Sequence, residues 1–160
     1  MARPPLQRVL RQLVRVGRAL RTPAPAPRPG PRVGLDTTWA GDRDGRPDPG
    51  EIVWTWVPFE DDPAQGKDRP VLLIGRRDAT TLVALQMTSK DHDRDAVQEA
   101  RAGRYWMDIG SGPWDSRGRA SEVRLNRFIE VRDADVRREG AILDREVYDR
   151  VVAAARQYLP

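Results

Sequence analysis

The chain contains no cysteine in its 160 residues, which excludes disulfide bonds, thiolate metal sites and cysteine nucleophiles. It has only two lysines, Lys67 and Lys90, and a single histidine, His92. No uninterrupted apolar stretch approaches the roughly 20 residues that a membrane-spanning helix needs. Together these absences favour a reducing compartment, and we expect a cytoplasmic location.

Acidic side chains are absent from the first 35 residues, which carry eight arginines. The whole chain has 28 basic and 24 acidic residues, so the part after residue 35 carries 20 basic against 24 acidic side chains, a net charge of −4. A net negative surface repels phosphate in general. Nucleic-acid binding by this part would therefore depend on a local cluster of cations.

The start of the chain is expected to form an extension rather than a packed domain. In residues 1–21, apolar side chains recur at spacings of three and four among arginines, which predicts a basic amphipathic helix. Such a helix can pack on its own domain, dock into a partner's groove or lie weakly on an anionic membrane surface. Residues 22–49 are rich in proline and glycine and are predicted to form a linker.

Residues 50–160 have the length of one ordinary domain and the pattern of a mainly β fold. Five runs of β-branched, aromatic and other apolar residues are expected to form strands, at 50–59, 71–74, 81–87, 105–109 and 122–131. A short helix is expected from Asp133, and a longer one after an N-cap at Asp144. This pattern predicts an α+β, mainly β domain built as a small barrel with a C-terminal helix.

The polar segment between the first two predicted strands is the first candidate for a functional site. It carries Lys67 and Arg69 directly before a buried run, and loops held by rigid strands commonly present binding groups. The guanidinium of Arg69 offers a planar pair of donors that matches two phosphate oxygens. Alternatively, Arg69 forms an ion pair with Asp68 or Glu60 that stiffens the loop.

Five pieces of sequence give a more specific signal through their order and spacing. They are GEIVW at 50–54, QGKDRPVLLIG at 65–75, LQMTSK at 85–90, SEVRLNRFIEV at 121–131 and REGAILDREVYDRVVAAARQYL at 138–159. In this order they resemble the MazF/PemK (Kid) family of bacterial type II toxin–antitoxin endoribonucleases. The resemblance implies an SH3-like barrel that forms a homodimer and is held inactive by a cognate antitoxin protein.

The resemblance also implies an activity: cleavage of single-stranded RNA without a metal or other cofactor. In that reaction a 2′-hydroxyl attacks the adjacent phosphorus and leaves a 2′,3′-cyclic phosphate and a free 5′-hydroxyl. This chemistry needs a base for the hydroxyl, an acid for the departing 5′-oxygen and donors for the extra negative charge.

Catalytic candidates follow from the matching positions. Arg69 resembles the family's catalytic loop arginine, and Thr88 and Ser89 match the strand end whose hydroxyls bond the scissile phosphate. Arg124 and Asn126 fall on an Arg-x-Asp pair that supplies an arginine and a catalytic aspartate. Asn126 replaces the aspartate, and an amide does not usefully accept a proton.

Further residues are expected to contact RNA around these positions: Gln65, Lys67, Lys90, His92 and Trp114. Histidine is the side chain that commonly transfers protons near neutral pH, so His92 could replace the missing acid, or it could be a solvated loop residue.

Four tryptophans, Trp54, Trp56, Trp106 and Trp114, could stack on unpaired bases or fill the core. Trp114 lies in a loop rich in glycine and proline, so we expect it to be the exposed one.

Two alternatives remain open at the level of sequence. The residues Asp91, His92, Asp93 and Asp95 allow a metal site, although their spacing matches no recognised ligand pattern. The same scaffold can also serve as a non-catalytic module that binds nucleic acid or protein, for example by inhibiting DNA gyrase. Asn126 and the net negative charge after residue 35 favour this second function.

Overall fold

The computed structural model describes residues 34–160, except for the side chains of residues 138–140. The amphipathic helix predicted at 1–21 and the first part of the predicted linker lie outside these residues. Within the described part, six antiparallel strands form one sheet in the order β4-β5-β3-β2-β1-β6. The strands are β1 (Glu51–Pro58), β2 (Gly66–Arg76), β3 (Thr81–Thr88), β4 (Trp106–Gly110), β5 (Ser121–Arg132) and β6 (Arg138–Ile142).

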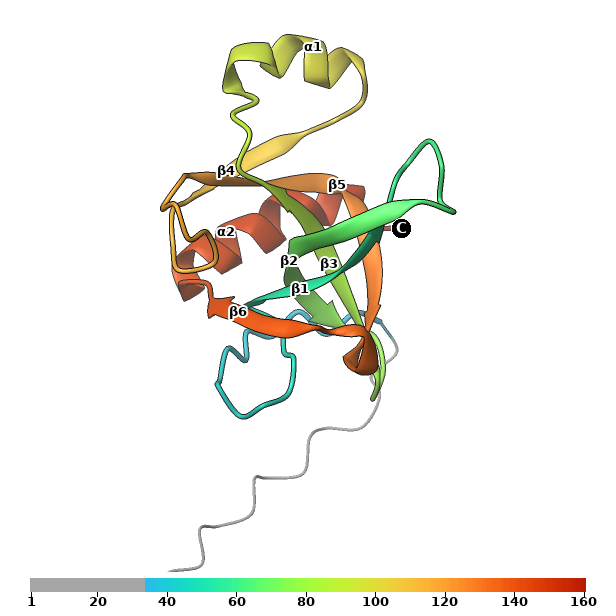
Figure 1. The fold of residues 1–160 in the computed structure, drawn as a ribbon, viewed down its shortest axis with the longest axis vertical. Coiled ribbons are helices and arrows are strands. Elements are labelled where there is room, and N and C mark those ends of the chain that lie inside the picture. The colour runs from blue at the N-terminus through green and yellow to red at the C-terminus, as the bar shows by residue number, and fades with distance from the viewer. Residues whose placement is uncertain (1–33) are drawn as a thin grey trace, which may run out of the picture.

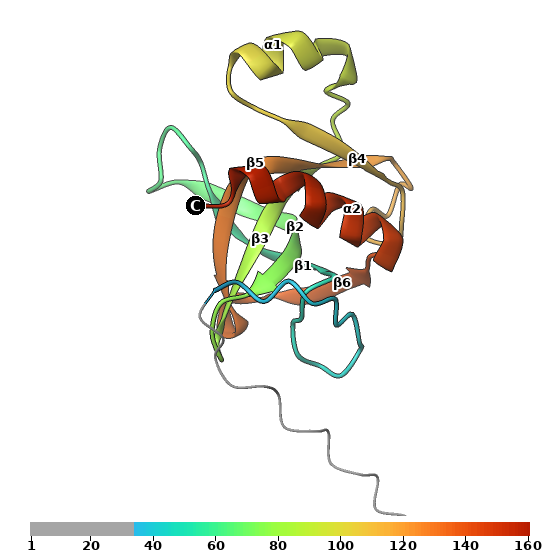
Figure 2. The same ribbon diagram turned by 180° about the vertical axis from the view of Figure 1, so that it is seen from behind.

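The sheet curls into a half-barrel, and helix α2 (Arg145–Ala155) lies across one of its faces (Figures 1 and 2). A shorter helix, α1 (Ala96–Arg101), stands away from the barrel with the chain that leads into β4 (Figure 1). Residues 34–160 also include three 3₁₀ turns, η1 (Asp93–Asp95), η2 (Asp133–Asp135) and η3 (Arg156–Tyr158). The mainly β, SH3-like small barrel with a C-terminal helix is thus confirmed.

Both faces of the sheet are apolar, because the central strands are buried on both sides. One face packs against α2 through a large cluster that includes Leu72, Leu85 and Val151. The opposite face carries a smaller cluster around Val53, Val71 and Leu73. Residues two apart on a strand share a face, so a single strand such as β2 contributes to both clusters.

Helix α2 begins where the sequence predicted. The Asp144 side chain caps it by accepting hydrogen bonds from the backbone N–H groups of Glu146 at 2.9 Å and Val147 at 3.3 Å. Its buried residues are Tyr148, which is 1% exposed, Val151, Val152 and Ala155, whereas Val147 is only partly buried. The Tyr148 hydroxyl reaches the carbonyl oxygen of Ile74 at 2.8 Å, which ties α2 to β2.

Part of the segment predicted to be a linker lies against the barrel. Asp36 pairs with Arg76 as an isolated antiparallel bridge, and Leu35 and Trp39 pack against the larger apolar cluster. Gly50 has a φ of 103°, and a Cβ placed there would lie 2.5 Å from the Trp39 ring, so glycine allows this close approach. The division of the chain into domains stays a prediction. In the part of the chain described here, no helix is both long and apolar enough to cross a membrane.

Candidate functional site

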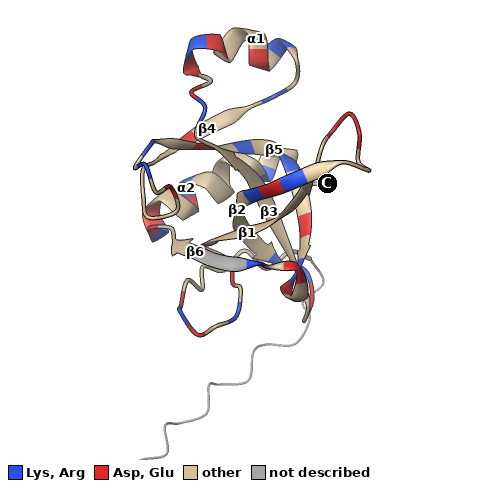
Figure 3. Ribbon diagram, viewed as in Figure 1, with Lys and Arg blue, Asp and Glu red and all other residues tan. Residues whose placement is uncertain are grey.

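A cavity of about 780 Å³ lies where the beginning of β2 meets the end of β3. Its cationic side chains are Lys67, Arg69, Lys90 and Arg119, and its hydroxyls include those of Thr88 and Ser89. Figure 3 shows the basic residues in the first part of β2. The structure therefore brings together six of the predicted residues, namely Lys67, Arg69, Thr88, Ser89, Lys90 and Trp114.

Arg69 lies on a strand, which corrects the prediction of a loop. Strand β2 begins at Gly66, so Lys67 and Arg69 are paired in register with Val57 and Thr55 of β1. The connecting loop is shorter than expected and ends with Gln65, whose amide nitrogen donates to the Asp62 carboxylate at 2.7 Å. Gln65 holds this turn together and is not part of the cavity lining.

Of the four cations that line the cavity, only Arg119 has a counter-ion among the described residues. Within the described part of the chain, Lys67, Arg69 and Lys90 form no ion pair. The alternative of an ion pair between Arg69 and Asp68 or Glu60 is wrong: Asp68 pairs with Arg137 at 3.1 Å, and Glu60 pairs with Arg124 at 2.6 Å. Burial lowers the pKa of Arg69 from its ordinary value. A partly buried guanidinium that forms no ion pair with residues 34–160 is well suited to receive an anion.

The hydroxyl groups lie at the end of β3. Thr88 is paired with Glu122 of β5, and its side-chain oxygen accepts a hydrogen bond from the Lys90 backbone N–H at 3.1 Å. This bond closes a turn that carries Ser89 and Lys90 around the rim of the cavity. Two hydroxyls and a lysine thus face the same space as Arg69.

Arg124 and Asn126 do not line this cavity. Arg124 is largely buried and donates to the Glu60 carboxylate at 2.6 Å, and its Nε donates to the Asn126 side-chain oxygen at 3.3 Å. The Asn126 amide nitrogen donates to the Gly103 carbonyl at 2.6 Å. Asn126 therefore anchors the connection between α1 and β4.

Arg127, which interacts with Arg124 and Glu60, is also near enough to Arg69 in the cavity for their charges to repel. Arg127, the neighbour of Asn126, has a pKa lowered first by burial and then by repulsion from Arg124 and Arg69, while Glu60 acts in the opposite direction. Partial burial is the largest single influence on the pKa of Glu60, and it raises this pKa. The hydrogen bond to Arg124 and the charges of Arg124, Arg127 and Arg104 together outweigh it, so the pKa is lowered overall. An anion entering beside Arg69 would therefore also be attracted by this second group of arginines.

His92 is buried, so the expectation of a solvated loop residue is wrong. Its Nδ1 lies 2.8 Å from Glu122 Oε2, and its backbone N–H donates to Glu122 Oε1 at 3.2 Å. The ring stacks on Trp106 of β4, with centroids 4.2 Å apart and an angle of 2° between the planes. His92 is outside the cavity lining, and its contacts hold the chain that follows Lys90 against β5.

Trp114 is only 8% exposed, which corrects the prediction of an exposed residue. Its indole N–H donates to the Ser121 hydroxyl at 3.0 Å, and the ring forms part of the cavity wall. The ring also occupies the space beside Gly112, where a Cβ would lie 2.1 Å from a ring carbon. The exposed tryptophan is Trp56 on β1, at 47%.

Two carboxylates in the cavity wall were missed as site residues. Asp68 and Asp115 both line it, and they pair with Arg137 at 3.1 Å and Arg119 at 2.9 Å. The signal for Asp68 was its position beside Arg69. Asp115 gave none, because its place in a loop depends on the turn from Gly112 to Gly118.

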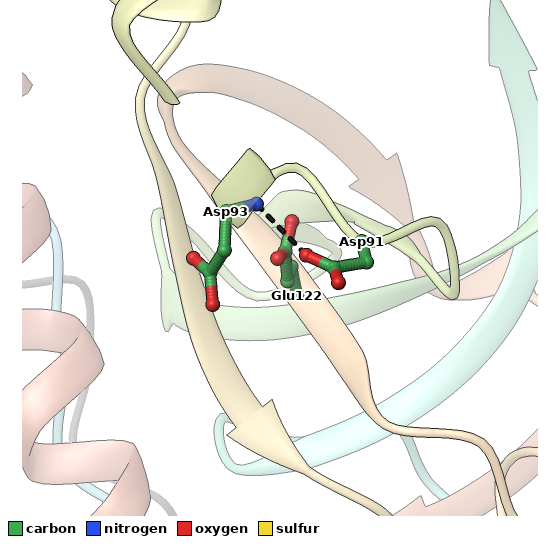
Figure 4. A group of neighbouring side chains, drawn as sticks. All are labelled: Asp91, Asp93 and Glu122. Carbon is green, nitrogen blue, oxygen red and sulfur yellow. Dashed lines mark hydrogen bonds between the residues drawn. The ribbon is translucent and has the colours of Figure 1, made fainter. Parts of the chain in front are cut away.

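Three carboxylates lie close enough to one another to hold a cation: Asp91, Asp93 and Glu122 (Figure 4). One oxygen from each lies within 4.8 Å of the others, and the Asp93 backbone N–H donates to Asp91 at 2.9 Å. Asp95, included in the metal alternative, is not in this group. Both oxygens of Glu122 are bonded to His92, so this carboxylate already has its partners.

Glu99 holds the segment from α1 to the start of β4 in place. Its carboxylate accepts from Arg104 at 2.6 and 2.9 Å and from the Trp106 indole at 3.0 Å. The hydrogen bond from Arg104, followed by that from Trp106, lowers the pKa of Glu99 from 4.5 to about 2. A lowered pKa means that this stabilisation is present above pH 4.5 and is lost as the pH falls through about 2.

We therefore expect the indole N–H resonance of Trp106 to titrate with a midpoint near pH 2. The measurement is an NMR pH titration of the full chain, with Glu99→Gln as the control that removes the titrating group. A midpoint near 4.5, the ordinary value, would contradict the network.

Comparisons with known proteins can now be set beside this geometry. Residues 48–159 match a family described as PemK-like, MazF-like toxin of type II toxin–antitoxin system. Among solved structures, the Mycobacterium tuberculosis toxin MazF-mt6 is similar at 17% identity and a TM-score of 0.42, covering 66% of this chain and 90% of that chain. MazE-MazF (Form-II) from Deinococcus radiodurans is similar at 17% identity and a TM-score of 0.43, covering 69% and 89%. No curated protein matches the chain.

Proposed function

The chain belongs to the family of PemK-like, MazF-like toxins of type II toxin–antitoxin systems, and from this premise we propose that it is an endoribonuclease that cleaves single-stranded RNA. The observation that carries the proposal is the cavity that joins Arg69 to the hydroxyls of Thr88 and Ser89. The Arg69 guanidinium, two hydroxyls and two lysines provide donors for a phosphate and for the charge that develops on it.

In the proposed reaction, the 2′-oxygen of one nucleotide forms a bond to the adjacent phosphorus while the bond from phosphorus to the 5′-oxygen breaks, and the departing 5′-oxygen takes up a proton from solvent water. Arg69 holds two phosphate oxygens and stabilises the added negative charge. Thr88 and Ser89 donate to the same phosphate. The products carry a 2′,3′-cyclic phosphate and a 5′-hydroxyl, and the reaction requires no metal or other cofactor.

Proton transfer needs a group other than Asn126, whose amide is committed to Gly103. Asp68 is the carboxylate that we assign as proton acceptor for the 2′-hydroxyl, because it lines the cavity next to Arg69 and is half-exposed. Arg124 lies outside the lining and acts through its charge and through Glu60, so we propose a supporting role for it.

The remaining predicted contacts are proposed with the same substrate in mind. Lys67 and Lys90 attract the RNA backbone, and Trp114 shapes the cavity wall. His92 supports the turn that carries Ser89 and Lys90 and has no direct contact with RNA. Within the family's toxin–antitoxin setting, we also propose that a cognate antitoxin covers this cavity, and that the protein acts in the cytoplasm as a homodimer.

The proposal is tested by incubating the full chain with single-stranded RNA in excess EDTA. We expect cleavage that continues in EDTA, with cyclic phosphate and 5′-hydroxyl ends identified by mass spectrometry. RNA with 2′-O-methyl groups lacks the nucleophile and should stay intact. Loss of cleavage in EDTA alone would contradict the metal-independent mechanism.

A second candidate function is a binding module that does not cleave. Asn126 favours it, because its amide has a structural role where close relatives are expected to carry an acid. RNA that is bound but remains intact at high protein concentration would support this second function over the first.

A further inference from the structure

Trp56 is a large apolar side chain placed directly beside the cavity. It is 47% exposed, and in the described part of the chain the only other exposed large hydrophobic residues are Val97 and Tyr105. Trp54 and Trp56 share a face of β1 because they are two residues apart. Trp54 lines the cavity, and the register places Trp56 opposite Asp68, which also lines it.

The indole of Trp56 is held against the neighbouring strand. A Cβ on Gly66 would lie 2.9 Å from a ring carbon of Trp56, so the glycine at the start of β2 leaves room for the ring to lie against the backbone. A side chain on a paired strand, packed against its neighbour, has little freedom to move. Trp56 therefore presents an aromatic surface in a defined place.

Trp56 also lines a second cavity, of about 440 Å³. Its lining includes Trp56, Thr55, Asp135 and Arg137. The ion pair between Asp68 and Arg137, at 3.1 Å, joins the two cavities, because Asp68 belongs to the first and Arg137 to the second. The volume lies within the range of about 300–1,000 Å³ that small-ligand sites occupy.

We propose that Trp56 is a stacking platform for an unpaired RNA base, and that the second cavity receives the nucleotide next to the one whose phosphate binds at Arg69. The proposal rests on the proposed function and adds a subsite to it. Aromatic faces bind unpaired bases with little dependence on sequence, whereas hydrogen bonds to the base edge give preference. Arg137 offers donors and Asp135 offers acceptors for that edge.

The charges around Trp56 favour RNA over a protein partner. Interfaces that bury apolar side chains are depleted of charged residues at their centres. Trp56 instead lies among Asp68, Arg137 and Asp135, and the neighbouring cavity holds three cations without ion-pair partners in the described part of the chain. A single aromatic ring beside free cations matches a chain of alternating bases and phosphates.

The test measures binding of a short fluorescent 2′-O-methyl RNA of random sequence, which cannot be cleaved. Trp56→Ala should weaken binding about 5- to 140-fold, the equivalent of ~1–3 kcal/mol per stacked base. Trp56→Phe should recover most of the affinity, because it restores a π face. Tyr105→Ala is the matched control, an exposed aromatic residue outside both cavities, and should bind as the wild type does.

A second oligonucleotide, of the same length and without bases, separates stacking from phosphate binding. On this probe the wild type and Trp56→Ala should bind equally. Equal affinities for the RNA would overturn the platform, as would a similar loss on both probes, since that loss would come from a disturbed phosphate site. A wild type that neither binds nor cleaves RNA would instead count against the proposed function.

Discussion

Replacing Arg69 with alanine is expected to lower the rate of RNA cleavage by about two to three orders of magnitude. Removing one preorganised donor from an oxyanion site costs about 10²–10³ in kcat. Arg69 lines the cavity with Thr88 and has no ion-pair partner in the described part of the chain, so its charge is available to a phosphate. For the same reason its loss should leave the melting temperature nearly unchanged.

The measurement compares single-turnover cleavage rates of the wild type and Arg69→Ala on one RNA. Arg77→Ala is the matched control, since Arg77 follows β2 at its other end and forms an exposed ion pair with Glu130. Arg69→Lys should retain part of the activity, because lysine supplies the charge without the planar pair of donors. Full activity of Arg69→Ala would show that cleavage does not take place in this cavity.

Replacing Tyr148 with alanine is expected to cost about 3–5 kcal/mol of unfolding free energy, the usual range for a large aromatic side chain removed from a core. The side chain is 1% exposed and packs in the cluster between α2 and the sheet. Its hydroxyl also lies 2.8 Å from the Ile74 carbonyl and 2.9 Å from that of Thr37. One residue therefore joins α2, β2 and the segment before β1.

Tyr148→Phe separates the hydroxyl from the ring and should cost about 1–3 kcal/mol, because the buried carbonyls lose a donor. Tyr105→Ala is the matched control, and removes a half-exposed ring that stacks on Tyr158 at 5.3 Å. It should cost about 1 kcal/mol. Urea unfolding of the three variants measures these differences, and equal losses for Tyr148→Ala and Tyr105→Ala would contradict the assigned packing.

Tyr148 also makes the stability of the fold decrease at alkaline pH. Burial, followed by the nearby charges of Asp149 and Asp36, raises the pKa of its hydroxyl well above the ordinary value of 10.0. Because the folded state holds this proton more tightly, the stabilisation is complete below pH 10.0 and declines as the pH rises further. Tyr148→Phe should show a smaller decline in the same urea experiment.

Local patterns were enough to predict the elements that form the core. The apolar runs of β1, β3 and β5 and the cap at Asp144 are signals contained within a few residues. Strand β6 was missed because REGAI has little β character, and it exists through pairing with the edge of β1. Helix α1 was missed for a similar reason, since it buries no residue.

The candidate site was predictable where neighbours in sequence are neighbours in space. Thr88 and Ser89 were candidates through the resemblance to the family's strand end, and the end of β3 places both of them in the cavity wall. His92 and Arg124 were placed differently, because their partners Glu122 and Glu60 lie 30 and 64 residues away. Such distant pairs leave no periodic signal, and it is the folded sheet, in which Thr88 of β3 pairs with Glu122 of β5, that brings His92 to its partner.

The early start of β2 has an energetic consequence for substrate binding. Fixing the backbone of a flexible residue costs about 1–2 kcal/mol, and a loop arginine would pay this cost each time it closed on an anion. Arg69 is already fixed through its pairing with Thr55, so only its side chain has to become ordered. The site is thus preorganised: its backbone loses conformational entropy during folding, so substrate binding does not have to order it.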